Sequence, residues 1–196
     1  VTVRAGAPDF SKAVVTPSSA KVDEQLAVKC TAYDKYGNIV DEQPHPWDLD
    51  ADAGCTAKSD GTGGSFVCTK TGVKQVRCKH KLVVDAVATL TEIKPGKPVT
   101  LKLKLDPDLP NYSHAQKIQL TGTGTDKYGN VVADIALKPI KLAPGGGTVD
   151  AVNAQVWFLS DGVYTATAYA DSDLKVSDSR KIRVDTNGPL IKVTSP

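Results

Sequence analysis

Apolar and polar residues alternate along many short segments of this chain, as in strands that bury one face and expose the other. β-Branched residues fill many apolar positions, and clusters of Gly, Pro, Asn and Asp separate the segments. The segments cover residues 26–33, 64–68, 73–78 and 82–90 in the first half, and 117–121, 155–159, 163–168 and 181–184 in the second half. Strands at this spacing predict antiparallel β-sandwiches. Residues 133–142 come nearest to an amphipathic helix, but Pro139 argues against one.

The sequence Asp-Lys-Tyr-Gly-Asn occurs twice, at residues 34–38 and 126–130, each time followed by two aliphatic residues. The copies lie about 90 residues apart, close to the ~100 residues of one β-sandwich. A repeat at this period indicates an array of similar modules rather than one large enzyme domain. The 196-residue chain is therefore expected to hold two tandem modules.

Segments with Pro and Gly mark the expected module boundaries. Residues 1–8 are expected to end a preceding copy and its linker, residues 9–94 to form the first module, residues 95–187 the second, and residues 188–196 to begin a further copy. The chain is thus expected to be a stretch of a longer array. Its Pro-containing linkers are stiffer than Gly/Ser-rich linkers would be.

All the cysteines lie in the first module, and none belongs to the close Cys-x-x-Cys pair that a zinc site favours. An even number of well-separated cysteines in β-type sequence predicts two disulfides instead. Disulfides imply export to an oxidising compartment. The cysteines are Cys30, Cys55, Cys68 and Cys78.

Alignment of the two copies indicates how the cysteines pair. The first and the last cysteine fall opposite the small residues Gly122 and Ala168, as expected where two sheets approach closely. This match favours one bridge between an early and a late strand. The other two cysteines are then expected to join a strand pair across the turn at residues 59–64. The predicted disulfides are Cys30–Cys78 and Cys55–Cys68.

The segments around the repeated sequence resemble a known family. Residues 31–40, Thr-Ala-Tyr-Asp-Lys-Tyr-Gly-Asn-Ile-Val, and residues 122–132, Gly-Thr-Gly-Thr-Asp-Lys-Tyr-Gly-Asn-Val-Val, resemble the strand-exit turn of bacterial immunoglobulin-like repeat domains in invasin-type and intimin-type surface proteins. Residues 161–167 resemble the family's late-strand signature, and residues 185–189 its inter-domain joint. The resemblance implies an all-β fold of two tandem immunoglobulin-like antiparallel β-sandwiches from a large exported surface protein.

Two features depart from the family pattern. Disulfides are not general in the family, and the sequence Pro-His-Pro-Trp at 44–47 disrupts the usual strand after the turn. The cysteines and Trp47 instead resemble the Cys-Trp-Cys core of immunoglobulin domains.

The repeated turn has a structural interpretation. Gly and Asn accept a positive φ, the Asp carboxylate can accept hydrogen bonds from turn amides, and the Tyr ring can cover the module edge with its hydroxyl exposed. Because turn chemistry explains every residue, it is favoured over a ligand-binding role. The residues assigned to these turns are Asp34, Tyr36, Gly37, Asn38, Asp126, Tyr128, Gly129 and Asn130.

Loop aspartates are the candidate metal ligands, because Ca²⁺ takes about six to eight oxygen ligands. The sequence lacks the Asp-rich loop of an EF-hand, so solvated loop carboxylates are the favoured interpretation, no cofactor is assigned, and calcium is kept as an alternative. The candidates are Asp48, Asp50, Asp52, Asp171, Asp173 and Asp185.

No residue is assigned to catalysis, and the chain is expected not to be an enzyme. His45, His80 and His114 are widely spaced and lack a partner pattern. The sequence contains no Gly-x-Ser-x-Gly elbow, His-Glu-x-x-His helix or phosphate loop.

Each module holds one tryptophan, Trp47 or Trp157, and each is expected to anchor the core of its sandwich. Trp157 precedes Phe158, and neighbours on a strand point to opposite faces. One of these two side chains is therefore expected to point outward or into an inter-domain contact.

The balance of charges along the chain limits the partners that it is expected to bind. The chain has 24 basic and 22 acidic residues, interspersed to a net charge of +2, which gives no electrostatic case for a nucleic acid or anionic membrane partner. No apolar run approaches the ~20 residues that cross a bilayer.

The favoured function is a semi-rigid, adhesive stalk of an extracellular, cell-surface or periplasmic protein, with any protein or glycan ligand bound mainly by neighbouring domains. The alternatives are an accessory or substrate-binding module of a secreted enzyme, and a protein-recognition module.

Overall fold

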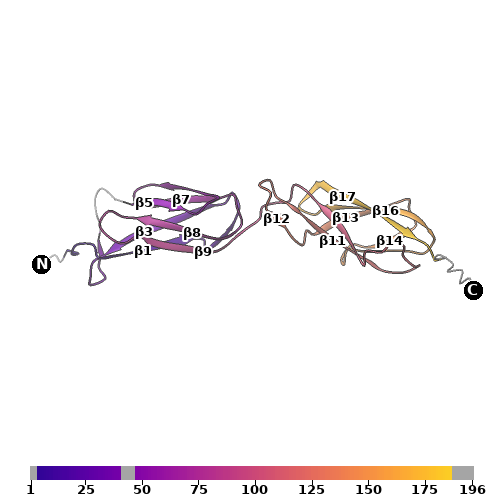
Figure 1. Ribbon diagram of the computed structural model, residues 1–196, viewed down its shortest axis with the longest axis horizontal. Coiled ribbons are helices and arrows are strands. Elements are labelled where there is room, and N and C mark those ends of the chain that lie inside the picture. The colour runs from indigo at the N-terminus through magenta and orange to yellow at the C-terminus, as the bar shows by residue number, and fades with distance from the viewer. Residues whose placement is uncertain (1–3, 41–46, 187–196) are drawn as a thin grey trace, which may run out of the picture. The chain divides into compact units, whose positions relative to one another are not determined.

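The computed structural model describes residues 4–40 and 47–186, and the regular structure of these residues consists of β-strands. The chain divides into two compact units, Val1–Gly96 and Lys97–Pro196 (Figure 1). The division lies close to the one expected after Lys94. The predicted all-β fold is confirmed. The expected remnants of neighbouring copies at 1–3 and 188–196 lie outside the described residues, as does His45.

Two sheets make up the first unit. Its strands are β1 Phe10–Thr16, β2 Ser19–Lys21, β3 Gln25–Tyr33, β4 Ile39–Val40, β5 Asp48–Ala51, β6 Cys55–Ser59, β7 Gly63–Cys68, β8 Gly72–Lys79 and β9 Ala86–Lys94. One sheet has the order β1-β3-β7-β6, with β4 paired to β3, and the other has the order β2-β9-β8-β5. The short strand β2 pairs parallel to β9, whereas the other described pairs of this unit are antiparallel.

The second unit repeats this plan. Its strands are β10 Lys102–Asp106, β11 Ile118–Thr125, β12 Val131–Val132, β13 Leu137–Ala143, β14 Gly147–Asp150, β15 Gln155–Phe158, β16 Gly162–Ala170 and β17 Asp173–Val184. One sheet has the order β10-β11-β15-β14, with β12 paired to β11, and the other has the order β13-β16-β17.

Alternation along the long strands builds each core. In β3 every second residue is buried, and in β16 the same pattern places small alanines inside the second sandwich. Fully burying one Leu or Val side chain stabilises a fold by about 1.5–3 kcal/mol. The buried residues of these two strands are Leu26, Val28, Cys30 and Ala32, and Tyr164, Ala166, Ala168 and Ala170.

The two tryptophans have different surroundings. Trp47 is buried and its ring lies 4.5 Å from the ring of His80, so it belongs to the core of the first unit as expected. In the second unit the buried member of the pair Trp157 and Phe158 is Phe158, which is only 1% exposed. Its ring stacks on that of Tyr164 with 4.1 Å between the ring centroids. Trp157 is half-buried on the outer face, where the ammonium of Lys117 lies 5.7 Å from its ring centroid. The expectation that Trp157 anchors a core was wrong.

The predicted strand at 82–90 also needs correction. Strand β9 starts only at Ala86, and the apolar residues Leu82 and Val84 are exposed in the preceding turn. The hydroxyl of Ser11 donates to the carbonyl of Val84 at 2.6 Å, which ties this turn to β1.

Candidate functional site

The first Asp-Lys-Tyr-Gly-Asn sequence forms a tight corner after β3, and the carboxylate of Asp34 holds it closed. Oδ1 accepts hydrogen bonds from the backbone N–H groups of Tyr36 and Asn38, both at 2.9 Å. The side-chain amide of Asn38 donates to both carboxylate oxygens, at 3.2 and 2.9 Å. Gly37 has φ of 83°, in the left-handed region that favours glycine. The chain then turns back, and β4 pairs with the end of β3.

These donors stabilise the charged form of the carboxylate. The side-chain amide of Asn38, followed by the backbone N–H of Gly6, lowers the pKa of Asp34 from 3.8 to about 2. Asp34 is only 2% exposed, so the corner places an ionised group at a buried position and satisfies it with neutral donors.

The second copy reproduces the corner after β11. Oδ1 of Asp126 accepts from the N–H groups of Tyr128 at 2.9 Å and Asn130 at 3.0 Å, and the amide of Asn130 donates to both oxygens. Gly129 has φ of 78°. The same five residue types therefore give the same hydrogen bonds in both units, as turn chemistry requires.

Each corner also contacts the segment that leads into its own unit. In the first unit the N–H of Gly6 donates to Oδ2 of Asp34 at 3.0 Å, and the N–H of Asp9 donates to the carbonyl of Tyr33. In the second unit Pro98 forms an isolated bridge with Asp126. The corner thus fixes the segment preceding the first strand as well as the turn itself.

The side chains that turn chemistry does not use face outward. Tyr36 is 77% exposed, and the ammonium of Lys35 lies 4.9 Å from its ring centroid. The ammonium of Lys127 lies at the same distance from the ring of Tyr128, which is half-buried. Each lysine covers a tyrosine ring through a cation–π contact.

The four cysteines form two disulfides, in the pairs favoured by the sequence alignment. Cys30 on β3 bonds to Cys78 on β8 and joins the two sheets. Cys55 and Cys68 face each other in the register of the β6–β7 pair and form the second bond. The second bond lies within the loop that the first one closes.

The second unit fills the positions of the inter-sheet bond with small residues. Ala168 is fully buried on β16. A side chain at Gly122 on β11 would meet Leu101 and Leu137 at 2.9 Å. Close sheet packing therefore replaces the disulfide in this unit.

The candidate calcium ligands are dispersed among other partners. Oδ2 of Asp50 lies 3.1 Å from the ammonium of Lys79 and 4.0 Å from Arg77, and the hydrogen bond from Lys79 is the main cause of the lowered pKa of Asp50. Asp52 accepts the N–H of Gln75 at 2.8 Å. Across the described residues no group of three or more His, Cys, Asp or Glu side chains is arranged to hold a metal ion.

The remaining candidates engage local backbone or neighbouring side chains. Asp48 accepts the N–H of Leu49, and Asp173 that of Lys175. Asp185 lies 3.4 Å from Arg183, and the N–H of Asp171 donates to Ala136.

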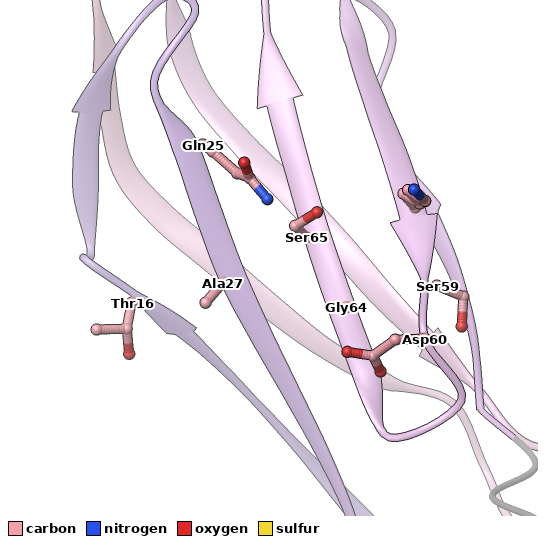
Figure 2. A pocket seen from close by; sticks show the side chains of 8 residues that line it. Thr16, Gln25, Ala27, Ser59, Asp60, Gly64 and Ser65 are labelled. Carbon is pink, nitrogen blue, oxygen red and sulfur yellow. The ribbon is translucent and has the colours of Figure 1, made fainter.

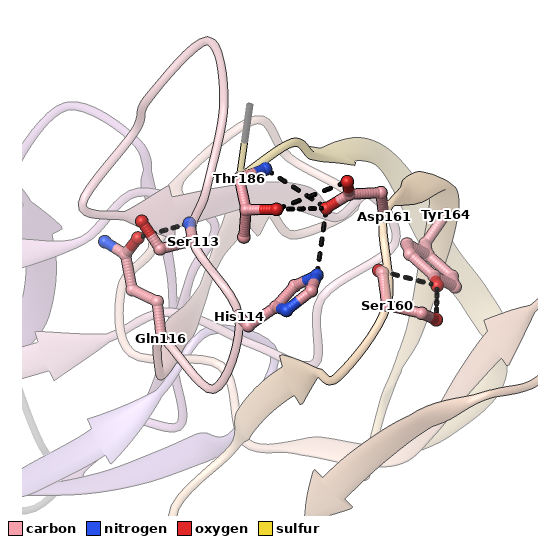
Figure 3. Close-up of polar contacts among 7 residues, drawn as sticks. All are labelled: Ser113, His114, Gln116, Ser160, Asp161, Tyr164 and Thr186. Atoms are coloured by element: carbon pink, nitrogen blue, oxygen red, sulfur yellow. Dashed lines mark hydrogen bonds and ion pairs between the residues drawn. The ribbon is translucent and has the colours of Figure 1, made fainter. Parts of the chain in front are cut away.

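A polar cluster that sequence analysis missed lies where the second unit ends. Asp161 Oδ1 accepts the N–H and the hydroxyl of Thr186, both at 3.1 Å, and lies 2.9 Å from Nε2 of His114 (Figure 3). The N–H of Thr186 is the main cause of the lowered pKa of Asp161. Three distant segments supply this cluster, so no local motif could have revealed it.

Among the described residues no helix is long and apolar enough to cross a membrane. His80 packs beside Trp47, and its Nδ1 accepts the N–H of Leu82 at 3.1 Å, so the structure gives it a packing and turn-stabilising role.

Comparison with solved structures shows which proteins share this fold. The Escherichia coli adhesin FdeC aligns over 94% of this chain and 68% of its own, with a TM-score of 0.59 and 19% identity. Invasin, a bacterial integrin-binding protein, aligns over 89% of this chain and 40% of its own, with a TM-score of 0.55 and 17% identity. InvD of Yersinia pseudotuberculosis aligns over 95% of this chain and 72% of its own, with a TM-score of 0.50 and 15% identity.

The chain therefore has the immunoglobulin-like β-sandwich fold found in these bacterial adhesins, as the sequence resemblance implied. No family model and no curated protein sequence matches it.

Proposed function

We propose that the two units form a non-catalytic spacer in an exported, surface-associated adhesive protein. The observation that carries the proposal is the corner of each unit, which engages the segment leading into its own sandwich: Gly6 is bound by the Asp34 carboxylate, and Pro98 is bridged to Asp126. A segment held by hydrogen bonds loses freedom that an unbound linker would keep. Such joints suit a module that transmits position rather than chemistry.

The disulfides support both the spacer role and the export of the protein. They indicate an oxidising compartment. The bond between Cys30 and Cys78 closes a loop with a sequence separation of 48 residues across both sheets. Pulling on the chain ends cannot extend the residues inside this loop while the bond is intact. The first unit is therefore suited to a protein that is stretched or exposed to proteases outside the cell.

Module exchange in the parent protein tests the proposal. We expect that replacing the two units with two unrelated β-sandwiches preserves adhesion to a ligand-coated surface. Deleting them without replacement is expected to reduce adhesion, because the binding domain would lie closer to the cell surface. Ligand binding by the purified parent protein in solution should remain the same in all three forms. Loss of adhesion in the exchanged protein would contradict a spacer role.

A further inference from the structure

The outer face of the β1-β3-β7-β6 sheet in the first unit contains a hollow. Thr16, Ala27, Ser65 and Lys58 are paired in one row across the four strands. The first three side chains are small, so they leave a low floor under a hollow of about 630 Å³. Figure 2 labels Thr16, Ala27 and Ser65 of this row, and the other lining residues are Gln25, Ser59, Asp60 and Gly64.

The second unit fills the corresponding row. Ala27 and Gln119 lie the same number of residues before their corner aspartates, Asp34 and Asp126. Ala27 pairs with a residue of β7, and Gln119 pairs with a residue of the equivalent strand β15. In the second unit the row reads Asp106, Gln119, Gln155 and Asp150. The amide of Gln155 donates to Gln119 at 3.1 Å, so the two long side chains occupy the centre. The same sheet position is thus open and small in one unit, and filled and acidic in the other.

The open face is also positively charged. Lys12, Lys29 and Lys58 are exposed on it, and the outward positions of β1, β3, β7 and β6 carry no carboxylate among the described residues. Of the described residues that line the hollow, Asp60 on the adjoining turn is the one carboxylate, and it accepts the N–H and the hydroxyl of Thr62 at 2.9 and 2.8 Å. In a chain whose charges otherwise nearly balance, this face collects an excess of cations.

The groups lining the hollow suit a hydroxyl-rich partner. Thr16, Ser65 and Gln25 offer two hydroxyls and an amide, and within the described part of the chain these side chains make no hydrogen bond to the protein. A sheet face presents side chains only, whereas extended peptides bind sheet edges through backbone groups. β3 runs nine residues, or about 30 Å, which gives room for several sugar units.

We propose that this face binds an anionic polysaccharide, with Lys29 and Lys58 contacting its carboxylate or sulfate groups and the hollow accepting a sugar ring. This role goes beyond the spacer function and does not depend on it. Charge attraction of this kind is weakened by salt because mobile ions screen exposed charges.

Binding of the purified chain to polygalacturonate, with neutral dextran as the comparison polymer, tests the proposal by calorimetry. We expect binding to polygalacturonate but not to dextran, and a weaker affinity as NaCl rises from about 50 to about 300 mM. The variant Lys29→Glu/Lys58→Glu should lose about tenfold or more in affinity. Lys102→Glu/Lys104→Glu makes the same charge change on the second unit and should stay within about twofold of the wild type.

A second variant separates the shape of the hollow from its charge. Ala27→Gln/Ser65→Gln copies the filled row of the second unit without changing any charge, and we expect it to weaken polygalacturonate binding about fivefold. Circular dichroism checks that both units of each variant are folded.

Absence of polygalacturonate binding at about 50 mM NaCl would overturn the proposal. Equal losses from the two lysine variants would overturn it too, because they would show unspecific attraction. Binding of poly-glutamate as tight as that of polygalacturonate would replace the glycan with an acidic peptide. The module-exchange experiment is independent of all these outcomes, so the spacer proposal stands or falls separately.

Discussion

The carboxylate of Asp34 accepts a hydrogen bond at 3.0 Å from the backbone N–H of Gly6, a residue 28 positions earlier in the chain. The same carboxylate closes the corner through Tyr36 and Asn38. One side chain therefore couples the geometry of a turn to the path of the segment before the sandwich. The coupling uses both carboxylate oxygens, since Oδ2 accepts from Gly6 and Oδ1 accepts from Tyr36 and Asn38.

Replacement of Asp34 by Asn should destabilise the first unit, because an amide has one acceptor oxygen and cannot satisfy all the donors around it. Each unit holds one of the two tryptophans. In a Trp157→Phe background, Trp47 fluorescence therefore reports urea unfolding of the first unit alone. We expect a lower urea midpoint for the Asp34→Asn variant. The exposed residue Asp85 supplies the control, since Asp85→Asn should leave the midpoint unchanged.

Acid should affect the first unit through the same group. The pKa of the Asp34 carboxyl is about 2 in the folded state against a usual value of 3.8, so the unfolded chain binds this proton more tightly than the folded chain does. The stabilisation by Asp34 is therefore complete above a pH of about 4 and is lost as the pH falls toward about 2. Between these values the wild-type urea midpoint should fall more steeply than that of Asp34→Asn. Parallel pH profiles for both proteins would contradict this assignment.

Gly37 is expected to be required for its backbone conformation and not for lack of space. Its φ is 83°, and a Cβ added there would meet nothing within 4 Å. Gly37→Ala should therefore cost about 1 kcal/mol through the left-handed conformation alone. Gly145 is also open, and its φ lies outside the left-handed range, so Gly145→Ala should leave stability unchanged or slightly raised. Equal effects of the two substitutions on urea unfolding would be inconsistent with this explanation.

Phe158 and Trp157 should differ sharply when each is replaced by Ala. The Phe158 ring is buried against Tyr164, so Phe158→Ala should destabilise the second unit by about 3–5 kcal/mol. Trp157 lies half-buried on the outer face, and Trp157→Ala should cost about 1 kcal/mol or less. Circular dichroism during urea unfolding measures both, since it needs no tryptophan. A larger loss for Trp157→Ala would place its ring in the core after all.

The same pair shows where sequence reasoning stops. Alternation indicates that Trp157 and Phe158 face opposite ways, but the pattern alone does not say which side chain is inside. Residue size favoured Trp157, whereas packing against Tyr164 selects Phe158. The corners follow from a local pattern that the sequence displays, whereas the strand predicted at 82–90 starts only at Ala86 because its first residues lie in a turn. The contact between Asp34 and Gly6 joins distant segments, and only the fold brings them together.

Calcium binding is the alternative to solvated loop carboxylates, and it is open to a direct test. Asp50 is paired with Lys79, and Asp52 accepts a backbone N–H, so a cation would have to displace existing partners. We therefore expect millimolar calcium or a chelator to leave the melting temperature of both units unchanged. Magnesium at the same concentration controls for ionic strength. A rise in melting temperature with calcium but not with magnesium would revive the calcium alternative.

Reduction should weaken the first unit selectively, because all the cysteines lie there. The chain-entropy model gives about 4 kcal/mol for the loop closed by Cys30–Cys78, with a sequence separation of 48, and about 3 kcal/mol for Cys55–Cys68, with a separation of 13. Thermal unfolding with reductant should lower the transition of the first unit and leave that of the second in place. Equal shifts of both transitions would contradict the assignment.

Single-molecule stretching gives a sharper readout of the same bonds. In the oxidised chain the residues between Cys30 and Cys78 cannot extend, so the first unit should release a short contour length. Reduction should add about 150–170 Å to that release, from 48 residues at roughly 3.3–3.6 Å each, less the 5.9 Å that already separates the two Cα atoms. The variant Cys55→Ser/Cys68→Ser should give the oxidised length of the wild type, because its missing bond lies inside the loop that remains closed. An added length in this variant without reductant would show that Cys30–Cys78 does not form.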